Sequence, residues 1–255
     1  MKTIILILSL LIQIYIFSQD TLVVFDRPGV ADSPYLVGKG ILQIENGITY
    51  LDKTGLSSSV IPTTLLRKYL GAQTEIRVGI NYEPQMMDII LDNEIHSYTP
   101  IAIGIKHKLW KEVKFRPEAS LIVNTFSPIQ KLGKLRKSVN SNLELGVQFQ
   151  NNINSKLGIN YNIGSLFTHN FSTSMLTYAI CTNYSITNKI AVFGEFFSYL
   201  SKQVSNEFGF DGGIVYFPSV HSQIDLSFVN NKFDKNHYLS VLLGYSFLLN
   251  KNNPL

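Results

Sequence analysis

The segment Leu-Gln-Ile-Glu-Asn-Gly-Ile-Thr-Tyr, residues 42–50, alternates apolar and polar side chains along almost its whole length. The parity of Leu42 carries the apolar residues, with Asn46 as the exception, and the other parity carries Gln, Glu, Gly and Thr. Successive side chains of a β-strand point to opposite faces of a sheet. The period of two therefore predicts a strand with one apolar and one polar face.

The same alternation recurs throughout the chain, for example in residues 74–83 and 142–150. We count about twelve such segments, each of about 9 to 14 residues, which is longer than the usual globular strand and long enough to cross a bilayer when tilted. They begin near Gly40, Ser59, Gln73, Thr99, Val113, Ser138, Lys156, Ser172, Lys189, Ser205, Ser222 and His237. Helical spacing is not sustained in any of them.

The composition is unusual for a soluble chain. The 255 residues are 45% hydrophobic and only 16% charged, against about 25% charged for an average soluble protein. The single cysteine, Cys181, excludes an intrachain disulfide framework and a zinc site built on several thiolates. The formal net charge of +4 is compatible with acidic lipid, nucleic acid or plain solubility, but the chain contains no phosphate-binding loop, and we expect no nucleic-acid partner.

The first 18 residues have the pattern of a secretory signal peptide: Lys2, an apolar run, and a small residue, Ser18, before the expected cleavage point. The alternative is an uncleaved anchor helix. No later run of 18 or more apolar residues is present, so helices are not expected to carry the mature chain across a membrane. We divide the chain into a signal peptide (1–18), a periplasmic N-terminal segment (19–39), a barrel (40–249) and a C-terminal tail (250–255).

The predicted connections are long on one side and short on the other. Residues 84–98 and 127–137 form the longest, whereas those on the opposite side, such as 70–72 and 187–188, are short. This asymmetry is typical of outer-membrane barrels. A soluble β-sandwich would also alternate, but with shorter strands and without the asymmetry. The sequence therefore favours an all-β fold: a transmembrane, antiparallel, up-and-down barrel of about twelve strands.

Three groups of residues resemble a known family. They are Asp26-Arg27-Pro28 with Ser33-Pro34 and residues 40–47, then residues 63–67 with Glu75-Ile76-Arg77, and Asp211-Gly212-Gly213 with Gln223-Ile224-Asp225. In this order they are similar to the outer-membrane family labelled putative phenol-degradation meta-pathway (MetA-pathway) transporter. The resemblance implies a β-barrel that carries small, often hydrophobic compounds across the outer membrane of a Gram-negative bacterium. One departure is the C-terminus, where eight residues follow Phe247 instead of the chain ending on an aromatic residue.

Charged residues within the predicted strands are the first candidates for a functional site. A charged lining could act as a selectivity filter or hold a polar solute, or acids and bases could simply pair across the interior, which is the interpretation we favour. Carboxylate pairs such as Glu45 and Glu144 could also serve acid/base catalysis, although their spacing does not require it. The predicted lumen-lining residues are Glu45, Arg67, Glu75, Arg77, Arg116, Glu118, Glu144, Glu207, Asp211 and Asp225.

The five histidines are scattered without metal-ligand spacing, and no Gly-x-Ser-x-Gly motif is present. We therefore predict no metal site, no catalytic residue and no cofactor. Twelve-stranded outer-membrane lipases exist with a Ser, His and Asn site on the barrel wall, so His107 or His169 remain candidates for an alternative in which the chain acts on lipid.

The N-terminal segment contains Pro28 and Pro34, which disfavour a long helix. We expect it in the periplasm or folded into the barrel mouth, as a tether rather than a plug. Its first residues, 20–24, resemble the box with which energy-coupled receptors contact their motor protein. Those receptors need a plug and about 22 strands, and because we expect neither in this chain, we interpret the resemblance as chance. A basic stretch, residues 131–137, could contact lipopolysaccharide phosphates or be merely solvated.

Together these features predict a monomeric outer-membrane barrel that acts as a passive channel or transporter for small, in part hydrophobic, molecules. The expected partners are outer-membrane lipids, lipopolysaccharide, the barrel-assembly machinery and a small-molecule solute. Two alternatives remain open at this point: a barrel-wall enzyme acting on lipid, and a closed structural or ligand-binding barrel.

Overall fold

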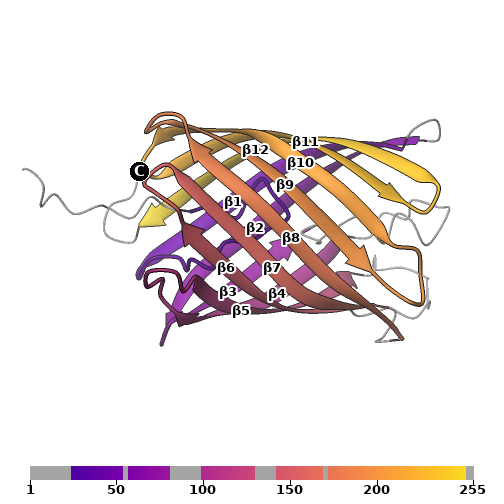
Figure 1. Cartoon of the computed structure of the whole chain (residues 1–255), viewed down its shortest axis with the longest axis horizontal. Coiled ribbons are helices and arrows are strands. Elements are labelled where there is room, and N and C mark those ends of the chain that lie inside the picture. Colours follow the sequence, from indigo (N-terminus) through magenta and orange to yellow (C-terminus); the bar gives the residue numbers. More distant parts are fainter. Residues whose placement is uncertain (1–23, 54–56, 81–98, 130–141, 169–171, 251–255) are drawn as a thin grey trace, which may run out of the picture.

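The computed structural model describes residues 24–53, 57–80, 99–129, 142–168 and 172–250. Within them lie twelve strands (Figure 1). The strands are β1 (Ile41–Lys53), β2 (Ser57–Gly71), β3 (Thr74–Ile80), β4 (Thr99–Trp110), β5 (Glu118–Ile129), β6 (Asn142–Asn152), β7 (Leu157–Thr168), β8 (Thr173–Ser185), β9 (Ile190–Leu200), β10 (Glu207–Ser219), β11 (Ser222–Phe233) and β12 (Asn236–Asn250). The part of the chain that is described contains no helix long and apolar enough to cross a membrane.

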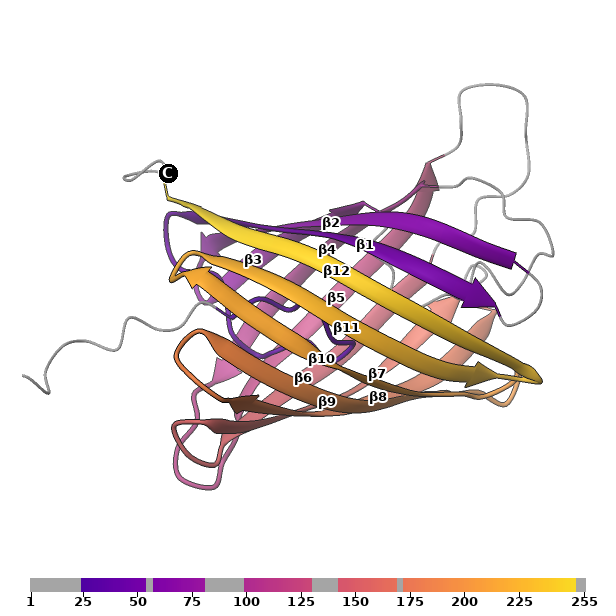
Figure 2. The same cartoon turned by 90° about the horizontal axis from the view of Figure 1, so that it is seen from above.

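The strands form a closed barrel in which each strand pairs with its neighbours in sequence. The first strand, β1, pairs antiparallel with β2 and also with the last strand, β12, which closes the barrel. The β1–β12 pairing extends from Ile41 opposite Asn250 to Lys53 opposite Tyr238. The strands run obliquely to the long axis of the molecule (Figures 1 and 2). The prediction of a twelve-stranded antiparallel up-and-down barrel is confirmed.

The alternation of the sequence separates the two faces of the wall. On β4, Ile103 and Ile105 are exposed on the outside, whereas Lys106 is fully buried in the interior. On β12, Leu243 is exposed and Ser246 is buried. A bilayer requires an apolar outer wall, and a closed barrel leaves no unpaired strand edge in lipid. The hydrophobic residues that alternate in sequence thus form the outer surface, and polar residues form the interior.

The connections at the end where β1 starts and β12 finishes are short, as predicted. The β2–β3 turn is only residues 72–73, where the left-handed backbone of Gly71, Ala72 and Gln73 makes the reversal. The β4–β5 connection is longer than predicted, because residues 111–117 form a separate turn in which Val113 pairs with Arg116. The strand that we expected to begin near Val113 therefore begins at Glu118.

At the opposite end, the connection that we expected to span residues 230–236 is a turn of only two residues, because both flanking strands extend further. Asp234, one of its two residues, adopts the left-handed conformation that Asp tolerates better than most residues. The predicted connection at 84–98 lies outside the described residues, as does most of that at 127–137, including the basic stretch. The signal peptide, residues 20–23 and the tail from residue 251 also lie outside them.

Candidate functional site in the barrel lumen

The described part of the N-terminal segment, residues 24–39, runs inside the barrel (Figure 2). Polar side chains of strands from all around the wall bind it, including Glu45 on β1, Glu75 on β3, Glu195 on β9 and Gln223 on β11. We expected the segment in the periplasm or folded into the barrel mouth as a tether, and a partial plug only as the weaker hypothesis. The structure corrects this interpretation, because the lumenal carboxylates and cations satisfy both the backbone and the side chains of the segment.

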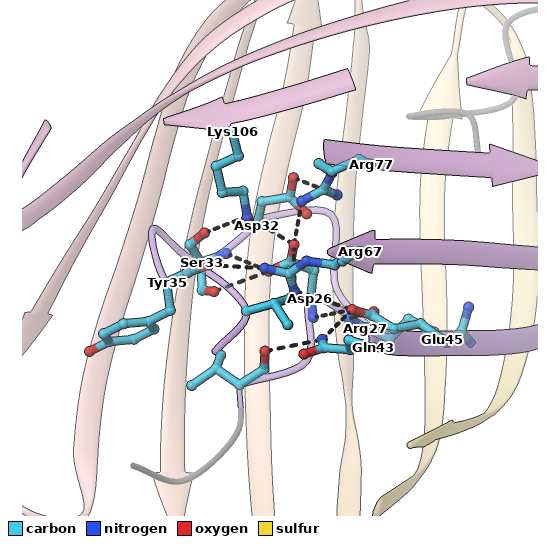
Figure 3. Close-up of polar contacts among 12 residues, drawn as sticks. Asp26, Arg27, Asp32, Ser33, Tyr35, Gln43, Glu45, Arg67, Arg77 and Lys106 are labelled. Carbon is cyan, nitrogen blue, oxygen red and sulfur yellow. Dashed lines mark hydrogen bonds and ion pairs between the residues drawn. The ribbon is translucent and has the colours of Figure 1, made fainter. Parts of the chain in front are cut away.

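The centre of the segment is held by a group that we call the Asp26 clamp: Asp26 with Arg67, Arg77 and Lys106 (Figure 3). One carboxylate oxygen, Asp26 Oδ2, lies 2.6 Å from Arg77 Nη1, 2.9 Å from Lys106 Nζ and 3.0 Å from Arg67 Nη1. All four side chains are at most 2% exposed. A cluster of buried cations would be costly without a counter-ion. Asp26 therefore stabilises the three cations, just as they hold Asp26 in place.

The second oxygen of Asp26 fixes the conformation of the segment. Asp26 Oδ1 accepts hydrogen bonds from the hydroxyl and the amide nitrogen of Ser33, at 3.0 and 3.2 Å, and so closes a loop between these residues. Burial by itself would raise the pKa of Asp26, but the charges of Arg67, Lys106 and Arg77 outweigh it and hold the pKa well below its usual range. The clamp therefore contains an ionised aspartate.

The clamp is part of a larger network of three cations and four carboxylates. Arg67 donates to Glu75 at 2.9 Å and to Glu45 at 3.2 Å, and Arg77 lies 3.2 Å from Asp32. Arg67 and Lys106 also donate to backbone carbonyl oxygens of the segment, those of Tyr35 and Ser33, each at 2.9 Å. The cations therefore bind the segment through its backbone as well as through Asp26.

The lumenal glutamates bind the segment through its backbone amides. Glu45 accepts from the amides of Asp26 and Arg27, at 3.3 and 3.1 Å, and Glu75 accepts from the amide of Val37 at 2.8 Å. Glu195 accepts from two consecutive amides, those of Val30 at 2.7 Å and Ala31 at 2.8 Å. We refer to Val30 and Ala31 as the apex of the segment. Charge-assisted bonds of this kind are about twice as strong as neutral ones.

Arg27 anchors the segment to a second part of the wall. Its guanidinium lies 3.3 Å from Asp225 and 3.2 Å from the hydroxyl of Thr63. It fits against β1 and β12 where these strands carry Gly47 and Gly244, and a methyl group at Gly244 would lie only 2.6 Å from Arg27 Nε. The absence of side chains at these two positions thus makes room for the arginine.

Nine of the ten predicted lumen residues face the interior. Glu45, Arg67, Glu75, Arg77 and Asp225 contact the N-terminal segment. Of the others, Glu118 pairs with Lys108, Glu144 accepts from Asn124 at 2.7 Å, and Glu207 accepts from Asn231 at 2.6 Å; Asp211 is described below. The charged groups of the described interior are thus mostly paired with neighbours.

Arg116 was predicted wrongly. Its side chain is exposed in the β4–β5 turn and donates to the carbonyl oxygen of Lys111 at 3.4 Å. The error follows from the strand start: with residues 111–117 in a turn, Arg116 lies before β5 rather than on its inner face. Glu45 and Glu144 do not form the carboxylate pair that we considered for acid/base catalysis, since Glu45 binds Arg67 and Glu144 binds Asn124.

Two residues of the clamp were not among the predicted site residues. Lys106 falls on the inward parity of β4, two residues after Gly104, and the alternation alone could have identified it. Asp26 had only its place in the family resemblance as a signal. Nothing in the sequence around Asp26 indicates that it enters the barrel, because its three cationic partners lie 41 to 80 residues away in sequence.

Beside the clamp, part of the lumen is apolar. Inward-facing residues of several strands form one cluster with Ala31 of the apex, and Val30 packs against it. We call the wall residues of this cluster the apolar section: Ala102, Phe126, Leu166, Met175, Ala179, Cys181, Phe197, Tyr199 and Val229. The lumen therefore combines a charged part, filled by the segment, with an apolar part that the apex contacts.

The described residues contain no group of three or more His, Cys, Asp or Glu side chains arranged to hold a metal ion. His107, a candidate for a lipid-directed enzyme, lies on the outer side of β4, with its Nδ1 2.9 Å from the hydroxyl of Thr74. His169, the other candidate, lies outside the described residues.

The closed, even-stranded barrel with an apolar outer wall and a polar interior identifies the protein as an outer-membrane β-barrel. The chain belongs to the family described as "Putative MetA-pathway of phenol degradation", whose model matches residues 25–247. The match begins inside the N-terminal segment, so most of the described part of the segment inside the barrel belongs to the family pattern.

Solved structures share the fold at low sequence identity. The KdgM porin in complex with disordered oligogalacturonate has a TM-score of 0.54 at 9% identity, over 80% of this chain and 99% of that chain. The CymD monoaromatic hydrocarbon channel has a TM-score of 0.51 at 8% identity, over 84% and 89%. An outer membrane channel from Pseudomonas putida F1 has a TM-score of 0.51 at 9% identity, over 84% and 97%. Comparison with curated protein sequences gave no match.

Proposed function

We propose that the protein is a passive outer-membrane channel for small molecules with an apolar part, and that its N-terminal segment narrows the lumen. The observation that carries the proposal is the division of the lumen into the Asp26 clamp and the apolar section, with the apex of the segment in contact with the latter. The apolar section lies mostly toward the end opposite the short turns, whereas the cations of the clamp lie toward the short turns.

The burial of the clamp supports the role of the segment. Arg67, Arg77 and Lys106 are at most 1% exposed, although they face the inside of a barrel that could in principle hold water. The segment and its partners therefore fill the lumen at this level, so passage requires the segment to move or solutes to pass beside it. A porin with an open, water-filled lumen would instead expose its charged lining.

The structural neighbours are consistent with this proposal, since they are described as a porin, a monoaromatic hydrocarbon channel and an outer membrane channel. The family description names phenol degradation. Both point to transport of small molecules, with an aromatic compound as one candidate class. That the chain has no enzymatic activity is part of our proposal, as is its function as a monomer without a cofactor.

We assign two roles to the lumen-facing charged residues. Glu45, Arg67, Glu75, Arg77 and Asp225 dock the N-terminal segment, because they contact it directly. Glu118, Glu144 and Glu207 line the lumen beyond it. We further propose that residues 1–18 are a cleaved signal peptide, that the outer wall contacts outer-membrane lipid and lipopolysaccharide, and that the barrel-assembly machinery inserts the chain.

Single-channel conductance and liposome swelling on refolded protein test the channel. We expect a measurable conductance and entry of small neutral solutes. Swelling should be faster in Phe126→Ala, because Phe126 belongs to the apolar section and is 2% exposed. The matched control is Phe115→Ala, which removes a fully exposed phenyl ring from the β4–β5 turn and should leave the swelling rate unchanged.

Complete impermeability of the wild type and of Phe126→Ala to every solute would refute the channel and favour a closed ligand-binding barrel. Release of fatty acid from phospholipid that is lost in His107→Ala would instead support the enzyme. Migration on a gel that changes with heating must accompany each variant, since it shows that the barrel has closed.

A further inference from the structure

Asp211 on β10 is a buried acid without a hydrogen-bonded partner. Its side chain faces the lumen and is only 5% exposed, and neither carboxylate oxygen has a partner with hydrogen-bonding geometry among the described residues. The amide of Gly212 and the hydroxyl of Ser227 interact with the carboxylate only weakly. Arg27 also attracts the carboxylate, but its guanidinium is already paired with Asp225. Burying a carboxyl group without a partner is costly, so its retention calls for an explanation.

A second carboxylate lies next to Asp211. Glu195 is directly opposite on the neighbouring strand β9, where the two residues are register partners. The groups differ in occupancy: Glu195 accepts both apex amides, at 2.7 and 2.8 Å, whereas Asp211 accepts none. The apex thus supplies hydrogen-bond donors to one half of a carboxylate pair and leaves the other half unsatisfied.

Aromatic rings border the pair on both sides along β10. The ring of Phe197 lies against Gly209, two residues before Asp211, and Phe193 Cε1 lies 2.8 Å from where a side chain of Gly213 would begin, two residues after it. Phe197 also packs edge-on against Tyr199, with ring centroids 6.3 Å apart. Val30 and Ala31 place their side chains among these apolar residues.

We propose that the apex occupies a binding site for a protonated primary amine with an apolar or aromatic body, and that such a solute displaces it. The inference rests on the proposed function and adds a solute class to it. The apex presents N–H donors to Glu195 and apolar side chains to the aromatic rings. An alkylammonium or arylalkylammonium ion offers the same combination and adds a positive charge between Glu195 and Asp211.

The chemistry favours an ammonium group over the alternatives. An ammonium ion carries three donors and a full charge, so it can serve both carboxylates at once, whereas an alcohol offers one donor and no charge. The bordering rings add cation–π attraction and cover the apolar body. A bound metal ion is a poorer explanation, since the described residues hold no group of three ligating side chains suited to one.

Equilibrium binding to the folded, full-length mature protein in detergent tests the site. The probes are phenethylammonium and its neutral counterpart phenethyl alcohol. At pH 7 we expect saturable binding of the amine, at least about tenfold weaker in Asp211→Asn, because the variant removes one of the two carboxylates that the ammonium group pairs with. Asp234→Asn, the same change in the exposed β11–β12 turn, should bind like the wild type. Partition of the probes into detergent affects both variants equally, so it cancels when their affinities are compared.

Hydrogen exchange of the apex tests the displacement. Saturating phenethylammonium should speed exchange of the Val30 and Ala31 amides, because these lose Glu195 as acceptor, while the Val37 amide on Glu75 should remain protected. Equal binding of the amine to Asp211→Asn and wild type, or binding of the alcohol as tight as that of the amine, would overturn the site. Binding without faster exchange at the apex would overturn the displacement.

Failure of this inference can be told apart from failure of the channel. Binding in detergent does not depend on conduction, so a non-conducting protein that binds the amine would remove the channel and keep the site. A conducting protein whose binding of phenethylammonium is indifferent to Asp211→Asn would keep the channel and remove the site.

Discussion

Replacing Asp26 by asparagine should release the N-terminal segment from the lumen. The substitution keeps the shape of the side chain but removes the charge that three cations share at 2.6–3.0 Å. Removing one partner of a buried ion pair costs about 3–5 kcal/mol, because the opposite charges stay buried. Barrel closure depends on strand pairing and not on Asp26, so we expect the cost to fall on docking of the segment. Its undocked population should rise by more than about 10²-fold.

The rate of cysteine labelling at Val37 can measure this population. Val37 is 5% exposed and its amide is bound by Glu75, so Val37→Cys should react slowly with a maleimide while the segment is docked. The background is Cys181→Ser, which removes the single native thiol. If docking is fast compared with labelling, the rate follows the undocked population, and Asp26→Asn should raise it by about 10²-fold. Conductance should rise in parallel.

The matched control for charge is Asp234→Asn, which lies in the exposed β11–β12 turn and should leave both measurements unchanged. A labelling rate in Asp26→Asn within about twofold of its parent would show that the clamp does not hold the segment. Faster labelling with unchanged conductance would show that the segment is held as described but does not restrict passage.

Leu243→Arg puts a charge on the lipid-facing side of β12, where Leu243 is 54% exposed, and should lower the free energy of unfolding from lipid by about 2–4 kcal/mol near the midplane. An unchanged urea midpoint would argue against this face meeting lipid. Gly104→Ala sets a methyl group against the Asn124 side chain and should cost about 1–3 kcal/mol, whereas Gly194→Ala, with open space around it, should not shift the midpoint. Because the pKa of Asp26 is lowered in the folded protein, its contribution to docking is complete above its unfolded pKa of about 4 and is lost as pH falls through the folded value. The difference in Val37 amide protection between wild type and Asp26→Asn should therefore be constant from pH 7 to 5. A decline within that range would contradict this linkage.

The barrel could be predicted from sequence because lipid and lumen impose opposite demands on alternate residues. Residues 42–50 alternate in this way, and their apolar residues Ile48 and Tyr50 are exposed on the outer wall. The lengths of the connections were harder to predict. Residues 111–117 continue an alternating pattern that a strand could adopt, but they form a turn in the structure, which is why Arg116 was placed in the lumen.

Docking of the N-terminal segment could not be predicted in the same way. Its main bonds to Glu45, Glu75 and Glu195 are made by backbone amides, which every residue except proline carries, so no side-chain pattern in the segment records them. The visible signal lay in the wall. Glu195 lies on the inward parity of β9, and both of its carboxylate oxygens accept hydrogen bonds from amides of the segment.

The two modes of attachment imply different consequences of change along the segment. Asp26 and Arg27 bind through their side chains, so their identity matters. The apex residues bind Glu195 through amides and contribute only small apolar side chains. We therefore expect changes at Val30 or Ala31 to act on packing against the apolar section, and to leave the ion pairs of Asp26 in place.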